Sequence, residues 1–271
     1  MDKLKKLILI AMSAVTPRRI RPRVVYYHSI HPSDKNSMHP DTFKSHLQWL
    51  IEHEYNIMSL TKFMNAFFGG SLPDRSVAVT FDDGYLDNFE FAIPILLDLK
   101  LEATFFVVSG LIDSSPTSSN KGYKLLPDKL MLNKGMLREM HSFGMEIGSH
   151  SRTHANIRQT LETSANCAGQ EAYSSKTDLE EILGENVTSF AYPNGQRGVF
   201  SDNTLSLLRK AGYQYGATTI WGSIGSSVHP LEIPRIEVRN NDSFQMLARK
   251  LTGKYDLKRL SHITLNNTKR W

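Results

Sequence analysis

Short apolar runs alternate with amphipathic stretches along most of the chain from residue 23 onward. The apolar runs are rich in β-branched and aromatic residues, which is typical of buried strands. The stretches between them carry apolar residues three and four positions apart, which is typical of helices that cover a sheet. The expected strands cover residues 23–30, 76–81, 102–108, 145–150, 187–195, 213–220 and 233–238, and the expected helices cover residues 39–55, 59–68, 88–100, 134–144, 164–184 and 201–212.

The order of these elements predicts the fold class. Parallel strands need a crossover connection that is usually a helix, so alternating strands and helices indicate a parallel sheet covered by helices. Seven or so strands, most of them followed by a helix, predict an α/β barrel. The 271 residues are enough for one such barrel, and we expect a single domain over residues 23–271.

The positive charge of the chain is concentrated at its N-terminal end. Residues 1–23 contain seven lysines and arginines and one acidic residue, so they carry +6, and the rest of the chain carries −1 of the net charge of +5. A nearly neutral body does not match a nucleic-acid-binding surface. We therefore expect no nucleic-acid partner.

The same end of the chain has an apolar stretch, residues 7–15, that is too short to span a bilayer. Its apolar residues repeat on one helical face between basic flanks, so we expect residues 1–22 to form an amphipathic helix on an anionic membrane surface. This predicts a cytoplasmic location with peripheral contact to the inner membrane face through residues 1–23. Two alternatives stay open: a cleaved signal peptide of a secreted or periplasmic protein, and a helix docked on the protein's own surface.

Pairs of polar residues stand where two of the expected strands end. Asp82 and Asp83 follow one apolar run, and His150 and His154 begin the loop after another. In barrels the chemistry lies at the carboxyl ends of the strands, so these side chains are expected on one face. The two histidines are four apart and would share a face on a helical turn. Because Cys167 is the only cysteine, a metal must be held by His and carboxylate.

This pattern predicts a divalent metal site. Two imidazoles and one carboxylate form a facial ligand set that leaves positions open for water and substrate. Asp83 is the natural third ligand beside His150 and His154. Asp82 can then act as the general base that takes a proton from water.

Three motifs resemble one known family. "TFDDG" at residues 80–84, "HSRTH" at 150–154 and "FAYPNG" at 190–195 are similar, in order and spacing, to the polysaccharide deacetylases of the NodB-homology type, carbohydrate esterase family 4. The resemblance covers roughly residues 23–238, and the chain is similar to the permuted exopolysaccharide deacetylases of this family. It implies a distorted (β/α)-barrel of the (β/α)7 type and a metal-dependent hydrolase that removes acetyl groups from N-acetylhexosamines.

The resemblance also assigns roles to residues. Asp82 matches the general base of the family, and Asp83, His150 and His154 match its metal ligands. The backbone N–H of Asn194, after the proline of the third motif, would stabilise the oxyanion.

The chain departs from the family pattern at two points. Ala191 stands where many members have an arginine that orients the base, and Arg235 in "IPRIEV" is a candidate replacement from a later strand. The late Leu-x-His motif that supplies the general acid is not found in clear form. In permuted members that histidine lies in an N-terminal Tyr-His motif, which "VVYYHSI" matches, so His28 is the expected acid and His229 is its rival.

The expected function is removal of N-acetyl groups from N-acetylhexosamine units of a glycan or a lipid-linked saccharide. The expected metal is Zn²⁺, because zinc is commonly held by such N/O ligand sets, although iron, cobalt, nickel or manganese fit the same site. A small-amide hydrolase similar to allantoinase and a catalytically inactive sugar-binding relative remain as alternatives.

Overall fold

The structure is a computed structural model that describes residues 21–114 and 129–253. Apart from its last two residues, the amphipathic helix expected over residues 1–22 lies outside this part of the chain. Within it, no helix is long and apolar enough to cross a membrane. The strands are β1 (Arg23–Tyr27), β2 (Asn56–Met58), β3 (Ser76–Phe81), β4 (Thr104–Val107), β5 (Glu146–Ser149), β6 (Ser189–Ala191), β7 (Tyr215–Ala217) and β8 (Ile236–Glu237), and the α-helices are α2 (Pro40–Glu52), α3 (Leu60–Phe68), α4 (Ile93–Asp98), α5 (Lys134–Ser142), α6 (Ile157–Thr163), α7 (Ala165–Gly169), α8 (Ser175–Leu183), α9 (Asp202–Lys210) and α10 (Phe244–Leu251).

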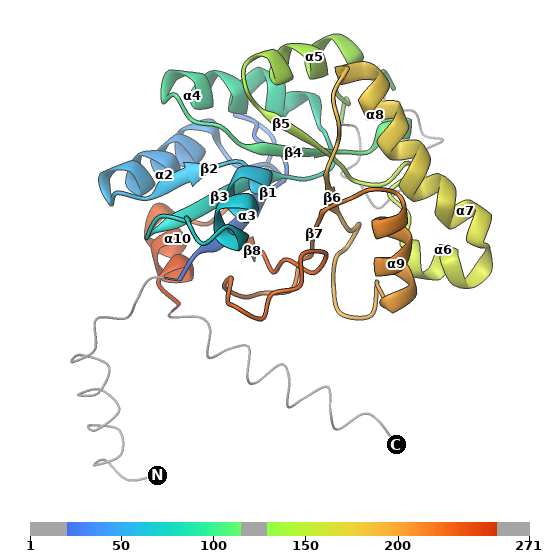
Figure 1. The fold of residues 1–271 in the computed structure, drawn as a ribbon. Helices are drawn as coiled ribbons and strands as arrows, with labels where there is room; N and C mark the ends of the chain where they lie inside the picture. Colours follow the sequence, from blue (N-terminus) through green and yellow to red (C-terminus); the bar gives the residue numbers. More distant parts are fainter. Residues whose placement is uncertain (1–20, 115–128, 254–271) are drawn as a thin grey trace.

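The eight strands form one curled, fully parallel sheet. Their order is β7-β6-β5-β4-β3-β1-β8, and β2 pairs with β3 outside this path. The two ends of the order approach each other, because Ala217 of β7 forms a parallel bridge with Ile233, just before β8. Helices α4, α5, α8 and α9 lie around the outside of the sheet (Figure 1). The predicted α/β class and distorted barrel, in a single domain, are confirmed.

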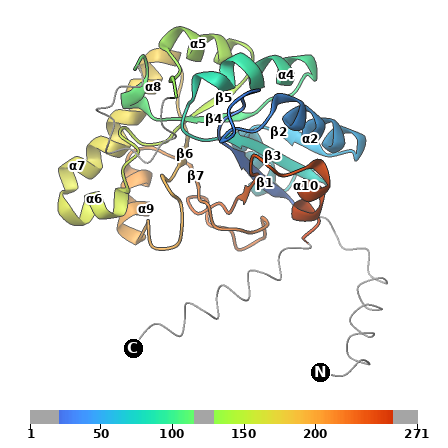
Figure 2. The same cartoon turned by 180° about the vertical axis from the view of Figure 1, so that it is seen from behind.

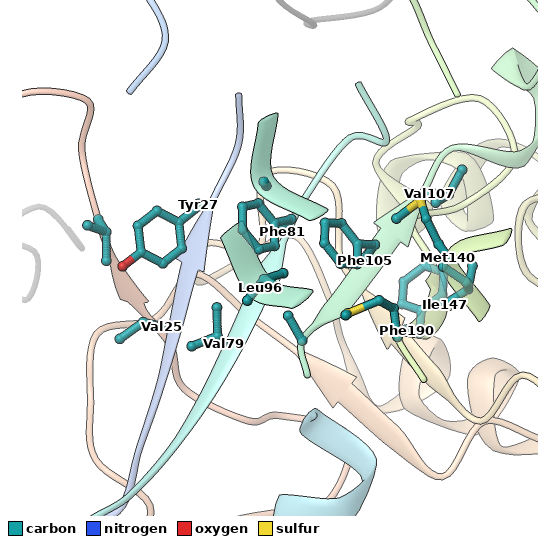
Figure 3. Packing of buried hydrophobic residues seen from close by; sticks show 14 of the residues in the cluster. Val25, Tyr27, Val79, Phe81, Leu96, Phe105, Val107, Met140, Ile147 and Phe190 are labelled. Atoms are coloured by element: carbon teal, nitrogen blue, oxygen red, sulfur yellow. The ribbon is translucent and has the colours of Figure 1, made fainter. Parts of the chain in front are cut away.

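Alternate residues of each strand face opposite sides of the sheet, and both sides are apolar. On the outer side, the rings of Tyr27 and Phe81 stack at 5.4 Å between centroids, and those of Phe81 and Phe105 at 4.6 Å. This ladder runs across three neighbouring strands and packs against Leu96 of α4 (Figure 3). The outer cluster fixes the register of β1, β3 and β4, and with it the places where these strands end.

A second buried cluster fills the inside of the barrel. It contains Phe106 of β4 and Ala191 of β6, together with side chains from β1, β3 and β7. Gly148 of β5 is required here, because a Cβ atom at this position would come within 2.6 Å of the Phe106 ring. The polar residues at the carboxyl ends of the strands stand above this cluster.

Three elements were not expected from the sequence, and one of them is helix α6, which lies directly before the helix expected over residues 164–184. The three-residue strand β2 pairs with the first half of β3. Helix α10 packs beside α2 (Figure 2). At this contact, Nε2 of the buried His46 in α2 lies 2.9 Å from the carbonyl oxygen of Asp242, just before α10. The helix expected over residues 88–100 begins as a π-helical turn, η1 (Asn88–Ala92), and continues as α4.

Candidate metal centre and active site

The predicted site residues gather at one rim of the barrel. Because all strands are parallel, their carboxyl ends lie on the same side. Asp82 and Asp83 follow β3, His150 follows β5 and His28 follows β1, whereas Asn194 lies three residues beyond the end of β6. Alternation along the strands turns His28 and Asp82 to the same inner side as Tyr26 and Thr80.

Asp83, His150 and His154 form a compact cluster. Oδ1 of Asp83 lies 3.4 Å from Nε2 of each histidine. The three ligand atoms lie within 4.8 Å of one another. All three side chains are buried, with exposures of 8%, 3% and 7%. The structure therefore brings together the three residues that the sequence predicted as metal ligands.

Hydrogen bonding shows that this cluster fits a cation. Nδ1 of His150 lies 2.8 Å from the carbonyl oxygen of Ala191. A carbonyl only accepts, so Nδ1 carries the hydrogen and the lone pair of Nε2 in the neutral ring faces Asp83. Two acceptors that face each other need a positive charge between them, and either a proton on Nε2 or a metal ion supplies it. Nδ1 of His154 is buried and has no hydrogen-bond partner in the described part of the chain, so besides an edge contact with the His150 ring this imidazole is held by the contact of its Nε2 with Asp83.

The pKa shifts of Asp83 and His150 also indicate that the cluster requires a positive charge beside the carboxylate. Burial opposes the charged forms, but hydrogen bonds from His150 and His154 hold the pKa of Asp83 well below its usual range. For His150 burial lowers the pKa, but the hydrogen bond to Asp83 and the charges of Asp82 and Asp83 together raise it above the ordinary value. Among the described residues, the two histidines are the only ion-pair partners of Asp83. A buried carboxylate without a lysine or arginine is costly unless a cation is bound, and N/O ligand sets of this kind suit a divalent metal.

The two histidines lie together as predicted, but the helical turn expected to pair them is wrong. Residues 150–156 form a loop rather than a helical turn. Ser151 (φ 63°) and His154 (φ 58°) adopt the left-handed region, which reverses the chain and turns His154 back toward Asp83. Asp83 itself has φ 78°. Such conformations cluster at functional sites.

Asp82 is held by a buried arginine. Nη1 and Nη2 of Arg235 donate to the two carboxylate oxygens of Asp82, each at 2.7 Å. Arg235 also donates to Thr80 Oγ1 at 3.1 Å and to the Thr218 carbonyl at 2.9 Å, and its guanidinium lies 4.5 Å from the centre of the Tyr26 ring. Burial would raise the pKa of Asp82, but the charges of Arg235 and His150 and the hydrogen bonds from Arg235 together outweigh it and lower the pKa. The contact that the sequence suggested for Arg235 is present.

The position of Arg235 follows from the strand order. Val25 pairs with Ile236, so Arg235 stands beside Val24, near the amino end of β1. From there its long side chain runs through the interior to Asp82 at the rim. In this chain Ala191, at the place of the usual arginine, instead offers its carbonyl to His150.

His28 stands at the same rim, directly after β1. Its ring makes an edge contact with Tyr26, with 5.5 Å between ring centres. Burial raises the pKa of Asp82 and of Asp83, and hydrogen bonds and charges of neighbouring residues lower it. The charge of His28 is one of the smaller contributions that lower both pKa values. His28 is partly exposed, so a substrate can reach it.

Asn194 presents a backbone N–H at the same rim. Its φ of 62° is left-handed, and Thr219 fixes the turn through a hydrogen bond from Oγ1 to the Asn194 carbonyl at 2.8 Å. The N–H of Asn194 pairs with none of the described residues. It therefore remains able to donate to a ligand.

The structure does not place His229 with the cluster. It lines a separate cavity of about 750 Å³ together with Trp221, Arg197 and Glu232. Its Nδ1 accepts a hydrogen bond from the N–H of Leu231 at 3.2 Å. The roles of the general acid, base and oxyanion donor stay predictions, but His28 is better placed than His229 for the first.

Comparison with known proteins identifies the family. The sequence profile described as "Polysaccharide deacetylase" matches residues 69–216. The chain belongs to the polysaccharide deacetylase family. This confirms the resemblance noted from the three motifs.

Relatives within the polysaccharide deacetylases include two curated enzymes. Poly-beta-1,6-N-acetyl-D-glucosamine N-deacetylase of Staphylococcus epidermidis is 29% identical over 217 residues, covering 78% of this chain and 71% of the relative. The enzyme of the same description from Staphylococcus aureus is 26% identical over 236 residues, covering 84% and 77%. This polysaccharide deacetylase therefore resembles those enzymes over most of its length.

Solved structures agree on the fold of this polysaccharide deacetylase. The Streptococcus pyogenes deacetylase PplD in complex with acetate has a TM-score of 0.72 and 26% identity, with 86% of this chain and 99% of that chain covered. IcaB from Ammonifex degensii has a TM-score of 0.72 at 23% identity, with 86% and 97% covered, and shows the fold alone. The predicted class of enzyme, a carbohydrate deacetylase, is confirmed.

Proposed function

We propose that this deacetylase hydrolyses the N-acetyl amide of N-acetylhexosamine units, in a glycan or a lipid-linked saccharide, with one divalent metal. The observation that carries the proposal is the convergence of Asp83, His150 and His154 on one buried point. The names of the staphylococcal relatives support an N-acetylglucosamine polymer as the substrate class. Zinc is the proposed metal, because two imidazoles and a carboxylate are common zinc ligands.

A divalent ion held by these three residues would polarise the acetyl carbonyl and lower the pKa of a water molecule. Asp82 accepts the proton of the attacking water. Its low pKa keeps it ionised at neutral pH, and Arg235 holds both of its oxygens in a fixed orientation. Orientation of the base by a neighbouring group is a common feature of hydrolytic sites.

The other two groups act on the amide itself. The Asn194 N–H donates to the acetyl oxygen as negative charge develops there. His28 donates a proton to the amide nitrogen as the C–N bond breaks. Water has then been added across the bond, and the products are acetate and a sugar with a free amine.

Acetate release tests the proposal. N-acetylglucosamine oligomers should yield acetate, whereas small cyclic and linear amides should yield neither ammonia nor urea. Removal of metal with a chelator should abolish the release, and added zinc should restore it. Release of ammonia or urea in place of acetate would support the small-amide alternative, and oligomer binding without turnover would support the inactive one.

We also propose that residues 1–20 place the enzyme at the cytoplasmic face of the inner membrane. The support is the sequence pattern alone: apolar residues on one helical face, between basic clusters. Flotation with anionic liposomes, with and without residues 1–20, tests the placement. Equal flotation of both forms would contradict it, and N-terminal processing at this segment in cells would favour a secreted or periplasmic enzyme.

A further inference from the structure

The loop between β5 and α6 carries His154 in a strained backbone. Ser151 and His154 are both left-handed, with φ of 63° and 58°. Residues with a Cβ atom adopt this region at a steric cost, so surrounding contacts must hold it. The contacts of this loop therefore decide where the His154 ring lies.

Glu171 holds the two residues directly before His154. Its Oε2 accepts the backbone N–H of Arg152 at 3.0 Å and that of Thr153 at 2.9 Å, and its Oε1 accepts the Thr153 hydroxyl at 2.6 Å. Glu171 is only 7% exposed. In the described part of the chain it forms no ion pair with a lysine, arginine or histidine, so the loop itself supplies its partners. Hydrogen bonds to a charged acceptor are about twice as strong as neutral ones.

A π-helical turn brings Glu171 to this position. The turn, η3 (Gln170–Ser174), is inserted between α7 and α8. It buries Glu171 and Ala172, whereas Tyr173 remains 42% exposed. Single π-helical turns inside α-helices occur frequently at functional sites, because the extra residue redirects the side chains around it.

The opposite side of the loop is held by backbone. The N–H groups of Ser109 and Gly110 donate to the carbonyls of Ser151 at 3.2 Å and Arg152 at 2.9 Å. A Cβ atom on Gly110 would come within 2.5 Å of the Arg152 carbonyl oxygen, so this close approach requires glycine. The loop thus has its carbonyls fixed on one side and its N–H groups fixed by Glu171 on the other.

We propose that Glu171 is a positioning residue for His154 and thereby sets the affinity of the site for its metal. The inference rests on the proposed metal dependence. With Arg152 and Thr153 fixed, Nε2 of His154 stays 3.4 Å from Asp83 Oδ1 before any ion binds. Without the carboxylate, the loop samples other conformations, and binding must order it first. Loss of groups that orient metal ligands typically reduces metal affinity by about 10–100-fold.

Three variants separate positioning from general stability. Glu171→Ala removes all three contacts. Glu171→Gln keeps the shape: its amide oxygen can accept both N–H groups, and its amide nitrogen can donate to the Thr153 hydroxyl. Glu162→Ala is the matched control, because Glu162 lies on α6 in an exposed i,i+4 pair with Arg158.

Two measurements need no substrate and so do not depend on the deacetylation reaction. The first is hydrogen–deuterium exchange at the amides of Arg152 and Thr153 in the metal-free protein. The second is the Kd for zinc alone, from competition with a chelator. Glu171→Ala should exchange faster at both amides and bind zinc about 10–100-fold more weakly. Glu171→Gln should remain close to wild type, and Glu162→Ala should change neither quantity.

Equal zinc affinity in wild type and Glu171→Ala would overturn the inference, as would equal weakening by Ala and Gln. Should Glu171→Ala fail to fold, Glu171→Asp replaces it, because the shorter carboxylate cannot reach all three donors. An unchanged zinc Kd in that variant would overturn the inference as well. A wild-type protein that binds no divalent metal contradicts the proposed function instead, so the two failures are distinguishable.

Discussion

Replacing Arg235 with methionine should expose how strongly the barrel depends on one buried ion pair. Arg235 and Asp82 share two hydrogen bonds of 2.7 Å, and their side chains are 0% and 3% exposed. Methionine keeps an unbranched apolar side chain in the interior but removes the guanidinium. Asp82 then remains in a buried position that was built around a positive charge.

The expected loss of stability follows from these distances. The charge centres of a guanidinium and a carboxylate joined by two such hydrogen bonds lie about 4 Å apart, and unit charges at that separation interact by about 4 kcal/mol at an effective dielectric constant near 20. Removing one partner of a buried pair typically costs about 3–5 kcal/mol, because the other charge is stranded. We expect Arg235→Met to lower the free energy of unfolding by that amount. Adding Asp82→Asn should recover about 2–3 kcal/mol, because the stranded charge is gone.

Urea unfolding of the metal-free proteins measures these values. The matched control is Arg239→Met, since Arg239 pairs with Glu237 at the surface, where the side chains are 67% and 39% exposed. Exposed pairs contribute about 0–1 kcal/mol, so this control should change little. A loss below about 1 kcal/mol for Arg235→Met, with additive effects of the two buried substitutions, would refute the reasoning.

Three further predictions concern the reaction and its surroundings. Asp82→Asn should lower kcat/KM for acetate release by about 10²–10⁴-fold while elemental analysis shows unchanged metal content, because the base is lost and the three metal ligands are kept. His28→Gln should lower kcat for acetate release by about 10²-fold or more and His229→Gln should not, and equal losses would contradict His28 as the acid. A hydrogen bond from Lys129 lowers the pKa of Asp34, so Asp34 stabilises the fold above its unfolded-state pKa, and this contribution disappears as the pH falls through the folded-state value. The stability deficit of Asp34→Asn in urea unfolding should therefore be largest at neutral pH and shrink in strong acid.

Much of the barrel could be predicted from the sequence because its strands are continuous apolar runs. The strand expected over residues 76–81 matches β3 in full. Such runs mark strands that are buried on both faces, as they are here by helices outside and by the inner cluster. Strand β2 was missed, because three residues give too short a pattern to read. Helix α10 was missed although Ser243 caps it by accepting the N–H of Met246.

The metal cluster could be predicted from residue types and from where strands end, but its geometry could not. The spacing of His150 and His154 suggested a helical turn, whereas two left-handed residues bring them together. Left-handed conformations at non-glycine positions leave little trace in a sequence. Glu171 shows the same limit, because a glutamate within a polar helical stretch looks solvent-exposed until the fold places it under the loop.

The link between Arg235 and Asp82 depends on the fold as a whole. The two residues are 153 positions apart, and they meet only because β8 pairs with β1, which pairs with β3. The alanine at position 191, where many family members have an arginine, is the sequence feature that points to Arg235, and the hydrophobic pattern alone does not distinguish it.

The proposed mechanism requires that Asp83, His150 and His154 share one divalent cation. A crystal structure of the protein loaded with one equivalent of zinc, with anomalous data at the zinc edge, tests this most directly. We predict a single strong peak between Asp83 Oδ1 and the Nε2 atoms of the two histidines. A peak elsewhere, or no peak at that point in protein that contains zinc, would contradict the account.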